Sequence, residues 1–480
     1  MTVVDIHCHT FNADDLPARG FIRRTRFDDS RIGELVGVLA DRLVQGQAPG
    51  YQAEKDELDR LLTVEAFTEA HEATPARVDP VDRFDADVDA AYASVEISDP
   101  QLLHEVGTLL ADEAAVTGAP GAEEGVWDWV TGARRAVRWV KLFGASRLQN
   151  TLLLVRNFDD EIDLYTPLVV DMDMGLYDRA NTRIREQIEL HEKISRLSML
   201  GRLPGVVRGR IHPFVGFDPR REVRDRMAGE VETALDVVKL AVETYGFVGV
   251  KLYPPMGFKP VGNTKTRDMT EAVARQVDDV LRELYAWCVA GDVPITVHCN
   301  RSNEAHDDYL EFSHPELWSN VLDEFPRLRL NLGHFGGANR DAPPSAWPIQ
   351  IAELATAEHP HLVADVGNHR IYDRVLRSQY LALLRRLFDA VPTAGMADRV
   401  MFGSDWYMVA IHPEHDRFLE TYRSAWLAEF GKESTESFLG GAALRFLGFD
   451  DPRAGSTRRL RARYERYAPD RTPTWLAGAA

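Results

Sequence analysis

Cysteine is scarce in this chain of 480 residues, and long apolar runs are absent. The three cysteines, Cys8, Cys288 and Cys299, lie far apart in the sequence, which excludes the disulfide framework of a small secreted protein. No stretch approaches about 20 uninterrupted apolar residues, so the sequence predicts no membrane-spanning helix and no membrane partner. No basic and apolar leader precedes the first expected strand, which favours the cytoplasm as the compartment.

Basic residues are outnumbered by acidic ones. The 56 Lys and Arg residues stand against 75 Asp and Glu residues, so the net charge is −19, which disfavours a nucleic-acid partner. Basic residues gather only near the C-terminus, in STRRLRARYERY. A solvated helix or a contact between copies of the chain explains this cluster, so a homo-oligomer stays open.

The chain does contain a regular alternation of short apolar runs and amphipathic helical stretches. Apolar strands that alternate with helices are typical of a parallel sheet with both faces covered. We count eight such runs, the number that closes a (β/α)8 TIM barrel. A doubly wound open sheet is the alternative, but no glycine-rich phosphate fingerprint follows any run. The runs are TVVDIHCH, YTPLVVDMDM, VRGRIHPFVGFDP, FVGVKLYPP, VPITVHCN, LRLNLGHFGG, HLVADVGN and DRVMFGSDW.

The first two strands of this barrel are separated by about 150 residues, far more than the roughly 30 of an ordinary βαβ unit. We therefore divide the chain into strand one (1–11), a mostly helical insertion (12–160), the remainder of the barrel (161–450) and a C-terminal tail (451–480). An insertion after strand one emerges on the face where barrel enzymes do their chemistry. It is expected to form a lid over the site; the alternative is a scaffold extension or a subunit contact.

The first strand ends in two histidines one residue apart. Side chains alternate along a strand, so His7 and His9 point to the same side and Cys8 to the other. Two imidazoles on one side of a strand end form half of a metal site. An ordinary polar strand end is the alternative, so the pair alone is weak evidence.

Further polar residues stand at the ends of other expected strands. Buried polar groups are costly unless they are paired or bind a metal, and one divalent ion would satisfy all of these. Zn2+ is the default for histidine and aspartate ligands, and Mn2+ or Fe2+ also fits. The candidate metal ligands are His7, His9, Lys251, His298, His334 and Asp405.

This set resembles the metal-dependent amidohydrolase superfamily. The pattern of that superfamily is HxH on strand one, Lys on strand four, His on strands five and six, and Asp on strand eight. The segment VKLYPP is similar to the corresponding segment of dihydroorotases. The segment FLGGAALRFLGF resembles the amidohydrolase-2 branch, which includes aminocarboxymuconate semialdehyde decarboxylase, although that branch usually has Asn where this chain has Ala442. The resemblance does not extend to the insertion.

The resemblance implies a hydrolase that attacks a C–N or C–O bond of a small amide, lactone or cyclic imide with metal-activated water. Asp405 would be the general base, and a protonated His334 would polarise the substrate carbonyl. The alternative is a non-oxidative decarboxylase, or a related hydratase or cyclising enzyme, acting on an aromatic or enoic carboxylate. A catalytically silent binding protein is the third hypothesis, disfavoured because no ligand is lost.

The state of Lys251 decides the number of metal ions. A carboxylated Lys251 would bridge two ions, whereas an unmodified one would hold a substrate anion beside a single ion. We expect it to take part in the metal centre, because a lysine among Val250, Leu252 and Tyr253 pays a desolvation cost unless it is paired.

Four residues near the strand ends are candidates for substrate binding. Tyr253 and Trp406 are expected to line an aromatic pocket, with plain core packing as the alternative. Asn300 and Arg301 follow His298 and are placed to meet a substrate carboxylate, with a surface salt bridge as the alternative for Arg301.

Overall fold

Parallel strands form the centre of the molecule. The structure is a computed structural model that describes residues 1–16, 31–44, 48–63, 80–116, 128–177, 179–338, 346–356 and 358–477. One sheet has the order β1-β2-β3 and the other runs from β4 to β9 in sequence order, with every pair parallel. The strands are β1 (Val4–Cys8), β2 (Leu164–Pro167), β3 (Arg210–Ile211), β4 (Phe214–Phe217), β5 (Gly249–Leu252), β6 (Ile295–His298), β7 (Leu330–Gly333), β8 (Leu362–Asp365) and β9 (Val400–Met401).

Two bridges join these sheets into a closed ring. Leu168, directly after β2, pairs with Phe214 of β4, and Cys8 of β1 pairs with Trp406, which follows β9. Strands β3 and β4 are successive halves of one strand, interrupted at Pro213, which has no backbone N–H to donate. With those halves counted together, the described residues form the eight-stranded barrel that the alternation of apolar runs predicts.

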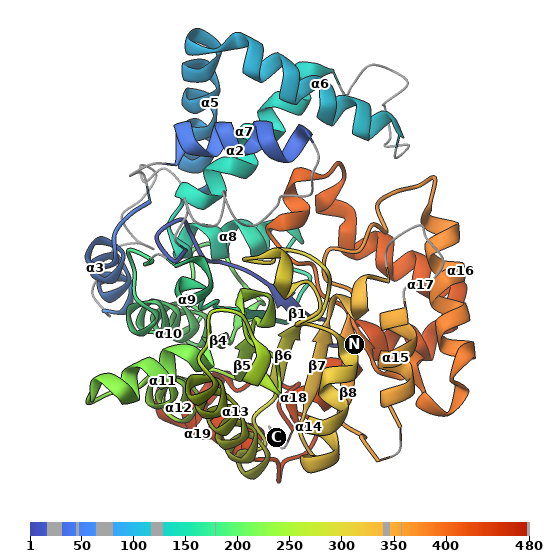
Figure 1. Ribbon diagram of the computed structural model, residues 1–480. Helices are drawn as coiled ribbons and strands as arrows, with labels where there is room; N and C mark the ends of the chain where they lie inside the picture. Colours follow the sequence, from blue (N-terminus) through green and yellow to red (C-terminus); the bar gives the residue numbers. More distant parts are fainter. Residues whose placement is uncertain are drawn as a thin grey trace.

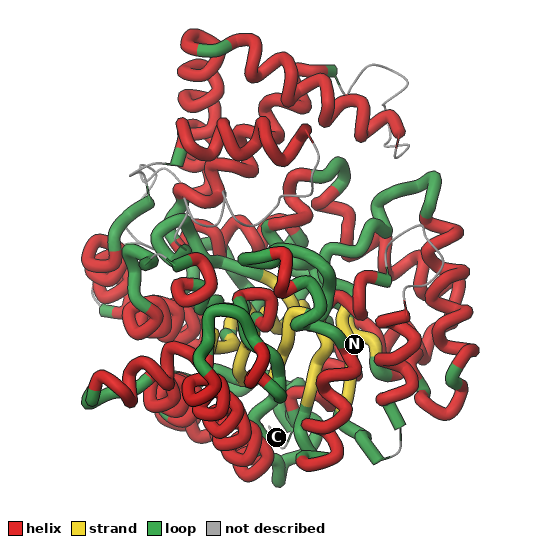
Figure 2. The backbone as a smooth tube through the Cα atoms, in the orientation of Figure 1, coloured by secondary structure: helices red, strands yellow, loops and turns green. Residues whose placement is uncertain are grey.

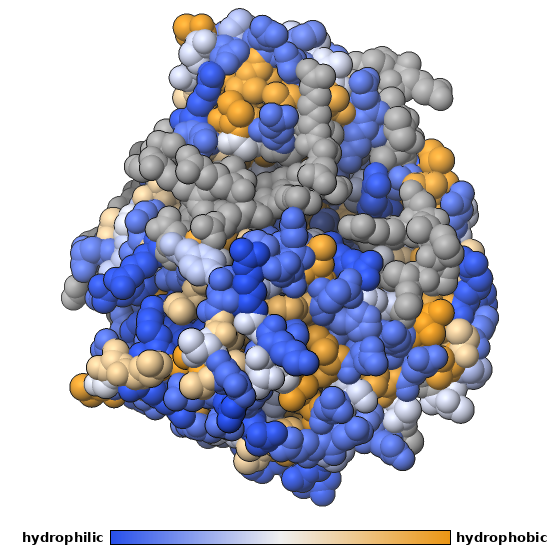
Figure 3. Space-filling model, in the orientation of Figure 1, coloured by the Kyte–Doolittle hydropathy of each residue, from blue (hydrophilic) through white to orange (hydrophobic). Residues whose placement is uncertain are grey.

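Helices surround this barrel (Figures 1 and 2). The helix α13 illustrates why they form: Thr270 caps its first turn, and Val277, Leu281 and Leu284 give it one buried apolar face. The outer helices are α10 (Ile184–Leu200), α11 (Pro219–Ala228), α12 (Ala234–Glu243), α13 (Glu271–Gly291), α14 (Ser319–Glu324), α15 (Ala346–Leu354), α16 (Arg377–Ala390), α17 (Phe418–Glu436) and α18 (Ala442–Leu447). The surface over α11–α13 is mostly hydrophilic (Figure 3).

The described residues of the long segment between β1 and β2 are mostly helical. Its helices are α2 (Arg31–Leu43), α3 (Tyr51–Leu62), α5 (Pro80–Ser98), α6 (Pro100–Val116), α7 (Trp129–Gly144) and α8 (Arg147–Asn157). Helices α2, α5 and α6 form a layer above the barrel in Figure 1. Helix α7 reaches down from this layer: Trp139 Nε1 donates at 2.9 Å to the carbonyl of Tyr407, in the loop that follows β9. The insertion therefore contacts the carboxyl end of the barrel, while its role as a lid stays a prediction.

A buried ion cluster fastens the two ends of this insertion together. Arg147, at the start of α8, is fully buried and pairs with Asp15 and Glu54. The Asn12 side chain donates to Glu54 at 3.2 Å and to the carbonyl of Ala145 at 3.1 Å. Because all the charges are paired, the cluster can stay buried where the chain leaves and rejoins the barrel.

The basic C-terminal segment forms helix α19 (Gly455–Tyr467), which is not simply solvated. Leu460 and Tyr464 are buried against the barrel, and Arg463 pairs with Glu192 of α10. Arg459 and Arg461 donate to the carbonyls of Gly291 and Ala477, whereas Arg458 and Arg466 are exposed, so the helix is only partly solvated. Throughout the described residues, every helix is too short or too polar to cross a membrane.

Candidate metal centre

The two histidines after β1 point into the barrel with one ring nitrogen each left open. His9 Nδ1 lies 3.0 Å from the carbonyl of Leu168, and a carbonyl only accepts, so Nδ1 carries the proton. His7 Nδ1 lies 2.9 Å from a carboxylate oxygen of Asp365 and donates in the same way. Burial lowers the pKa of His7 to about 4, against the opposing charge of Asp365, so its ring is neutral. Both Nε2 atoms therefore offer a lone pair, as a metal ligand must.

Asp405 completes a compact set of three ligands. It follows β9 with a positive φ of 54°, and its N–H donates to the carbonyl of His7 at 2.6 Å. Its Oδ1 lies 3.2 Å from His9 Nε2 and 3.7 Å from His7 Nε2. Burial acts to raise the pKa of Asp405, but the close imidazoles of His9, His7 and His334 outweigh burial, so the pKa is lowered. The ligand atoms of His7, His9 and Asp405 all lie within 4.8 Å of one another.

His334 stands beside this set on the turn after β7. The turn has positive φ at both His334 and Phe335, which carries the imidazole back over the barrel opening. Its Nδ1 lies 2.9 Å from the carbonyl of Gly367, so its Nε2 is also open. The ring lies 4.6 Å from that of His7 and 4.7 Å from that of His298, centre to centre.

His298, at the end of β6, is held differently. Its Nε2 lies 3.0 Å from the hydroxyl of Ser302, and its ring stacks on that of Tyr253 at 4.4 Å. Burial lowers its pKa well below the usual value. The structure thus brings His298 next to His334 but not into the three-ligand set, and its metal-binding role stays a prediction.

Lys251 lies inside the barrel on β5 and is almost fully buried. Its Nζ has no hydrogen-bond partner among the described residues and lies 5.6 Å above the ring of Tyr253. Burial lowers the pKa of the amine to about 8, opposed by the charges of Asp365 and Asp405. A buried donor without a partner is costly, which suits a site where a ligand supplies the missing acceptor.

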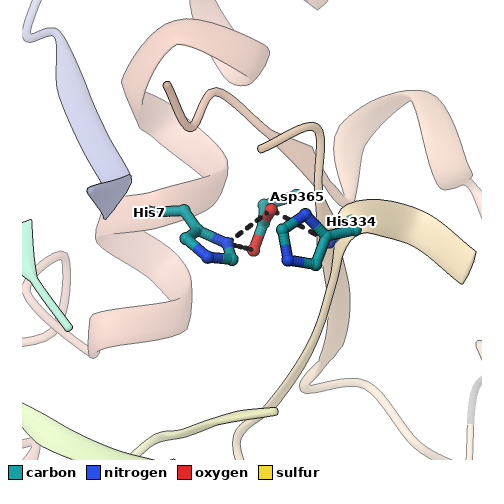
Figure 4. A group of neighbouring side chains, drawn as sticks. All are labelled: His7, His334 and Asp365. Atoms are coloured by element: carbon teal, nitrogen blue, oxygen red, sulfur yellow. Dashed lines mark hydrogen bonds and ion pairs between the residues drawn. The ribbon is translucent and has the colours of Figure 1, made fainter. Parts of the chain in front are cut away.

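The sequence analysis missed Asp365, the last residue of β8. Its carboxylate lies between the ring of His7 and the backbone of His334 (Figure 4). It ends the run HLVADVGN, so the rule that selected the other strand ends could have found it. The superfamily pattern has no residue on this strand, so the resemblance does not indicate Asp365.

The substrate-binding candidates lie in different surroundings. Trp406 is buried, and its Nε1 has no partner among the described side chains. Tyr253 is buried, and its hydroxyl accepts from Asn303 at 3.2 Å. Asn300 is half-buried and accepts from the N–H of Arg301. The Arg301 side chain is about half exposed and pairs with Glu311 at 2.7 Å, the surface salt bridge that was the alternative. Substrate contact by these residues stays a prediction.

The chain is similar to several proteins of known structure. No curated protein matches the chain. Solved structures with similar folds include an amidohydrolase from Burkholderia multivorans with bound zinc (16% identity, 65% of this chain and 91% of that one, TM-score 0.40). An uncharacterised TIM-barrel protein from Bordetella bronchiseptica is 17% identical (72% and 90%, TM-score 0.37). The 5-carboxyvanillate decarboxylase of Sphingomonas paucimobilis is 14% identical (62% and 82%, TM-score 0.37). At this level of similarity, nothing about the reaction follows.

A match of another kind covers the barrel itself. The sequence model of the family described as Amidohydrolase matches residues 217–449, from the end of β4 to the residues after α18. That range contains Lys251, His298, His334, Asp365 and Asp405. Over residues 217–449, the chain is similar to the amidohydrolase family.

Proposed function

We propose that this protein is a metal-dependent hydrolase that holds one divalent ion at His7, His9 and Asp405 and cleaves a C–N or C–O bond of a small substrate. The observation that carries the proposal is the convergence of two open histidine nitrogens and one carboxylate oxygen within 4.8 Å. Two imidazoles and a carboxylate suit Zn2+, with Mn2+ or Fe2+ as alternatives. The similarity of residues 217–449 to the amidohydrolase family supports an enzyme.

One ion fits the described side chains better than two. A second group of possible ligands, His7, His334 and Asp365, shares His7 with the first group. Within this group His7 Nδ1 donates to the Asp365 carboxylate at 2.9 and 3.0 Å, so the two side chains are already hydrogen-bonded to each other. His298 Nε2 meets Ser302. These contacts favour a single ion with an unmodified Lys251, the arrangement that the sequence analysis left as the alternative.

The chain's own residues then have distinct roles. A bound ion would supply Lewis acidity and a water of lowered pKa. Asp405 takes a proton from the attacking water and passes it to the leaving group. His334, when it carries a proton on Nε2 as well as on Nδ1, donates to the substrate carbonyl oxygen. Lys251 binds an anionic group of the substrate, which would provide the acceptor that its Nζ lacks.

A decarboxylase is the second candidate, and the same lysine favours it. A buried cation next to a single-metal set is a site for a substrate carboxylate, and such a carboxylate is what a decarboxylase removes. Either reaction takes a small molecule, and we propose no nucleic-acid or membrane partner. The cytoplasm remains the proposed compartment.

Metal analysis and product analysis test the proposal in sequence. We expect about one equivalent of transition metal per chain in purified protein, lost in His9→Gln and kept in the control His104→Gln on the exposed face of α6. Less than about a tenth of an equivalent in the wild type, with no uptake on addition, would contradict the metal centre. Lactones, amides and aromatic carboxylates are then supplied as substrates: acid release without CO2 supports the hydrolase, and CO2 release identifies the decarboxylase.

A further inference from the structure

The carboxylate of Asp365 is surrounded by hydrogen-bond donors. Its oxygens lie 2.9 and 3.0 Å from His7 Nδ1 and 2.7 Å from the side-chain amide nitrogen of Asn331. The backbone N–H groups of His334 and Gly367 donate to it at 3.1 and 2.9 Å. The side chain is fully buried, at the end of β8. Because all four neighbouring groups donate hydrogen bonds, this position suits an ionised carboxylate, which only accepts them.

Glycines close the space around the pair formed by His7 and Asp365. A Cβ atom at Gly367 would lie 3.0 Å from both Asp365 Oδ1 and His7 Nδ1. At Gly333 it would lie 3.2 Å from Asp365 Oδ2, and at Gly403 2.7 Å from His7 Cβ. Those glycines lie at the ends of β7, β8 and β9. Any larger residue there would push the ring and the carboxylate from their places.

A second buried carboxylate in the same barrel shows what is particular about Asp365. Asp5 accepts from the backbone N–H and the hydroxyl of Ser404, at 3.0 and 2.6 Å, and from the N–H of His7 at 3.2 Å. It contacts no imidazole ring through these bonds. Burial raises the pKa of Asp5 to about 7, whereas the pKa of Asp365 lies well below its usual value, because His7 and the other donors outweigh burial.

We infer that Asp365 is a positioning residue: it keeps the proton of His7 on Nδ1 and holds the His7 ring and the His334 turn in register with each other. The inference rests on the proposed metal centre, in which His7 binds through Nε2. A partner that orients a ligating histidine also raises its basicity, and loss of such a partner weakens metal binding about 10- to 100-fold.

Asp365→Asn tests this role with little change of shape. The amide group would face donors on every side, so it must either turn its NH2 towards His7 Nδ1 or displace another partner. The first outcome moves the His7 proton to Nε2 and blocks the ligand; the second leaves a neutral, weaker acceptor. The matched control is Asp5→Asn, because the Ser404 hydroxyl can rotate to accept from the new amide.

Titration of metal-depleted protein with Co2+ supplies the readout, through affinity and through the visible absorption of the bound ion. We expect the affinity of Asp365→Asn to fall about 10- to 100-fold with a changed spectrum, and that of Asp5→Asn to stay within about threefold. Equal affinity and an identical spectrum in Asp365→Asn would overturn the inference. A wild type that binds no Co2+ would instead overturn the proposed metal centre.

A second variant covers the case in which Asp365→Asn does not fold. Gly367→Ala leaves both side chains in place but inserts a methyl group 3.0 Å from each. We expect it to weaken Co2+ binding at least severalfold while the metal-free protein keeps its near-ultraviolet circular dichroism. Unchanged affinity in this folded variant would show that the contact between His7 and Asp365 does not set metal binding.

Discussion

His9 Nε2 lies 3.2 Å from Asp405 Oδ1, although the two residues stand at opposite ends of the barrel sequence. They meet because the first strand pairs with the segment after the last one, through Cys8 and Trp406. The proposed metal centre therefore requires a closed barrel. A bound ion stabilises the folded state alone, so removing it lowers the stability of the whole barrel.

Asp405→Asn separates metal binding from proton transfer. The amide oxygen can still coordinate an ion, but the side chain no longer accepts a proton at neutral pH. We expect turnover to fall about 100- to 10,000-fold while the metal content falls much less. Elemental analysis and steady-state kinetics on the same sample measure both, with the exposed Asp398→Asn as control. Turnover within about tenfold of the wild type would contradict the base assignment.

Lys251→Met tests whether the lysine belongs to the substrate or to a two-metal bridge. The variant removes a buried amine that has no partner among the described residues, so we expect the free energy of unfolding to rise by about 1–3 kcal/mol. Metal content should stay at one equivalent while KM rises, and Lys239→Met on the outer helix α12 should change neither. Loss of metal, or a carbamate signal in 13C NMR of wild type incubated with labelled bicarbonate, would support the bridge.

Trp139→Phe tests the contact between the insertion and the site. The variant keeps most of the packing but loses the hydrogen bond to the carbonyl of Tyr407, two residues after Asp405. We expect a stability loss of about 1 kcal/mol and a several-fold decrease in kcat, because the loop that carries Asp405 loses a support. Urea unfolding and kinetics measure the two effects. Lower stability with unchanged kcat would mean that α7 is scaffold only.

The buried ring of His212 should make the stability of the protein depend on pH, whether or not a metal is bound. It lies between Ser195 and Tyr464 at the other end of the barrel, and burial lowers its pKa to about 3, helped by Arg463 and Arg210. Between that value and the unfolded pKa of about 6.5, the unfolded chain binds the extra proton. Stability contributed by the neutral ring is therefore complete above pH 6.5 and falls by about 1.4 kcal/mol per pH unit below it.

Urea unfolding of wild type and His212→Gln in the presence of a chelator, from pH 7 to pH 4, checks this expectation. The variant should show a shallower decline, by close to one proton. Parallel curves for the two proteins would contradict the assignment of the proton to His212.

Strand-end residues were predictable because two simple periodicities determine where they lie. Alternation along β1 places His7 and His9 on one side, and the parallel barrel brings their strand next to the one before Asp405. The interruption of the third strand at Pro213 was less visible, because the apolar pattern VRGRIHPFVGF continues across it. The apolar pattern of a sequence indicates which residues are buried, whereas a proline interrupts the backbone hydrogen bonds of a strand without changing that pattern.

Other features depend on contacts that no local pattern records. Arg301 pairs with Glu311, a partner that its position next to His298 does not indicate, and its contact with a substrate stays a prediction. Asp365 owes its importance to donors from β1, β7 and its own loop, and a single strand sequence contains none of that information. Spacing predicts which residues can meet, while their partners depend on tertiary packing.

The ion cluster of Arg147, Asp15 and Glu54 ties the two ends of the insertion to each other. It holds Asp15 and Arg147 together, so to the barrel the whole segment between them has the span of a short loop. Helices of the insertion that lie beyond this ion cluster can therefore be lengthened, shortened or exchanged without altering the register of any barrel strand. A barrel of this kind can acquire a different insertion over its proposed metal centre while the residues of that centre stay the same.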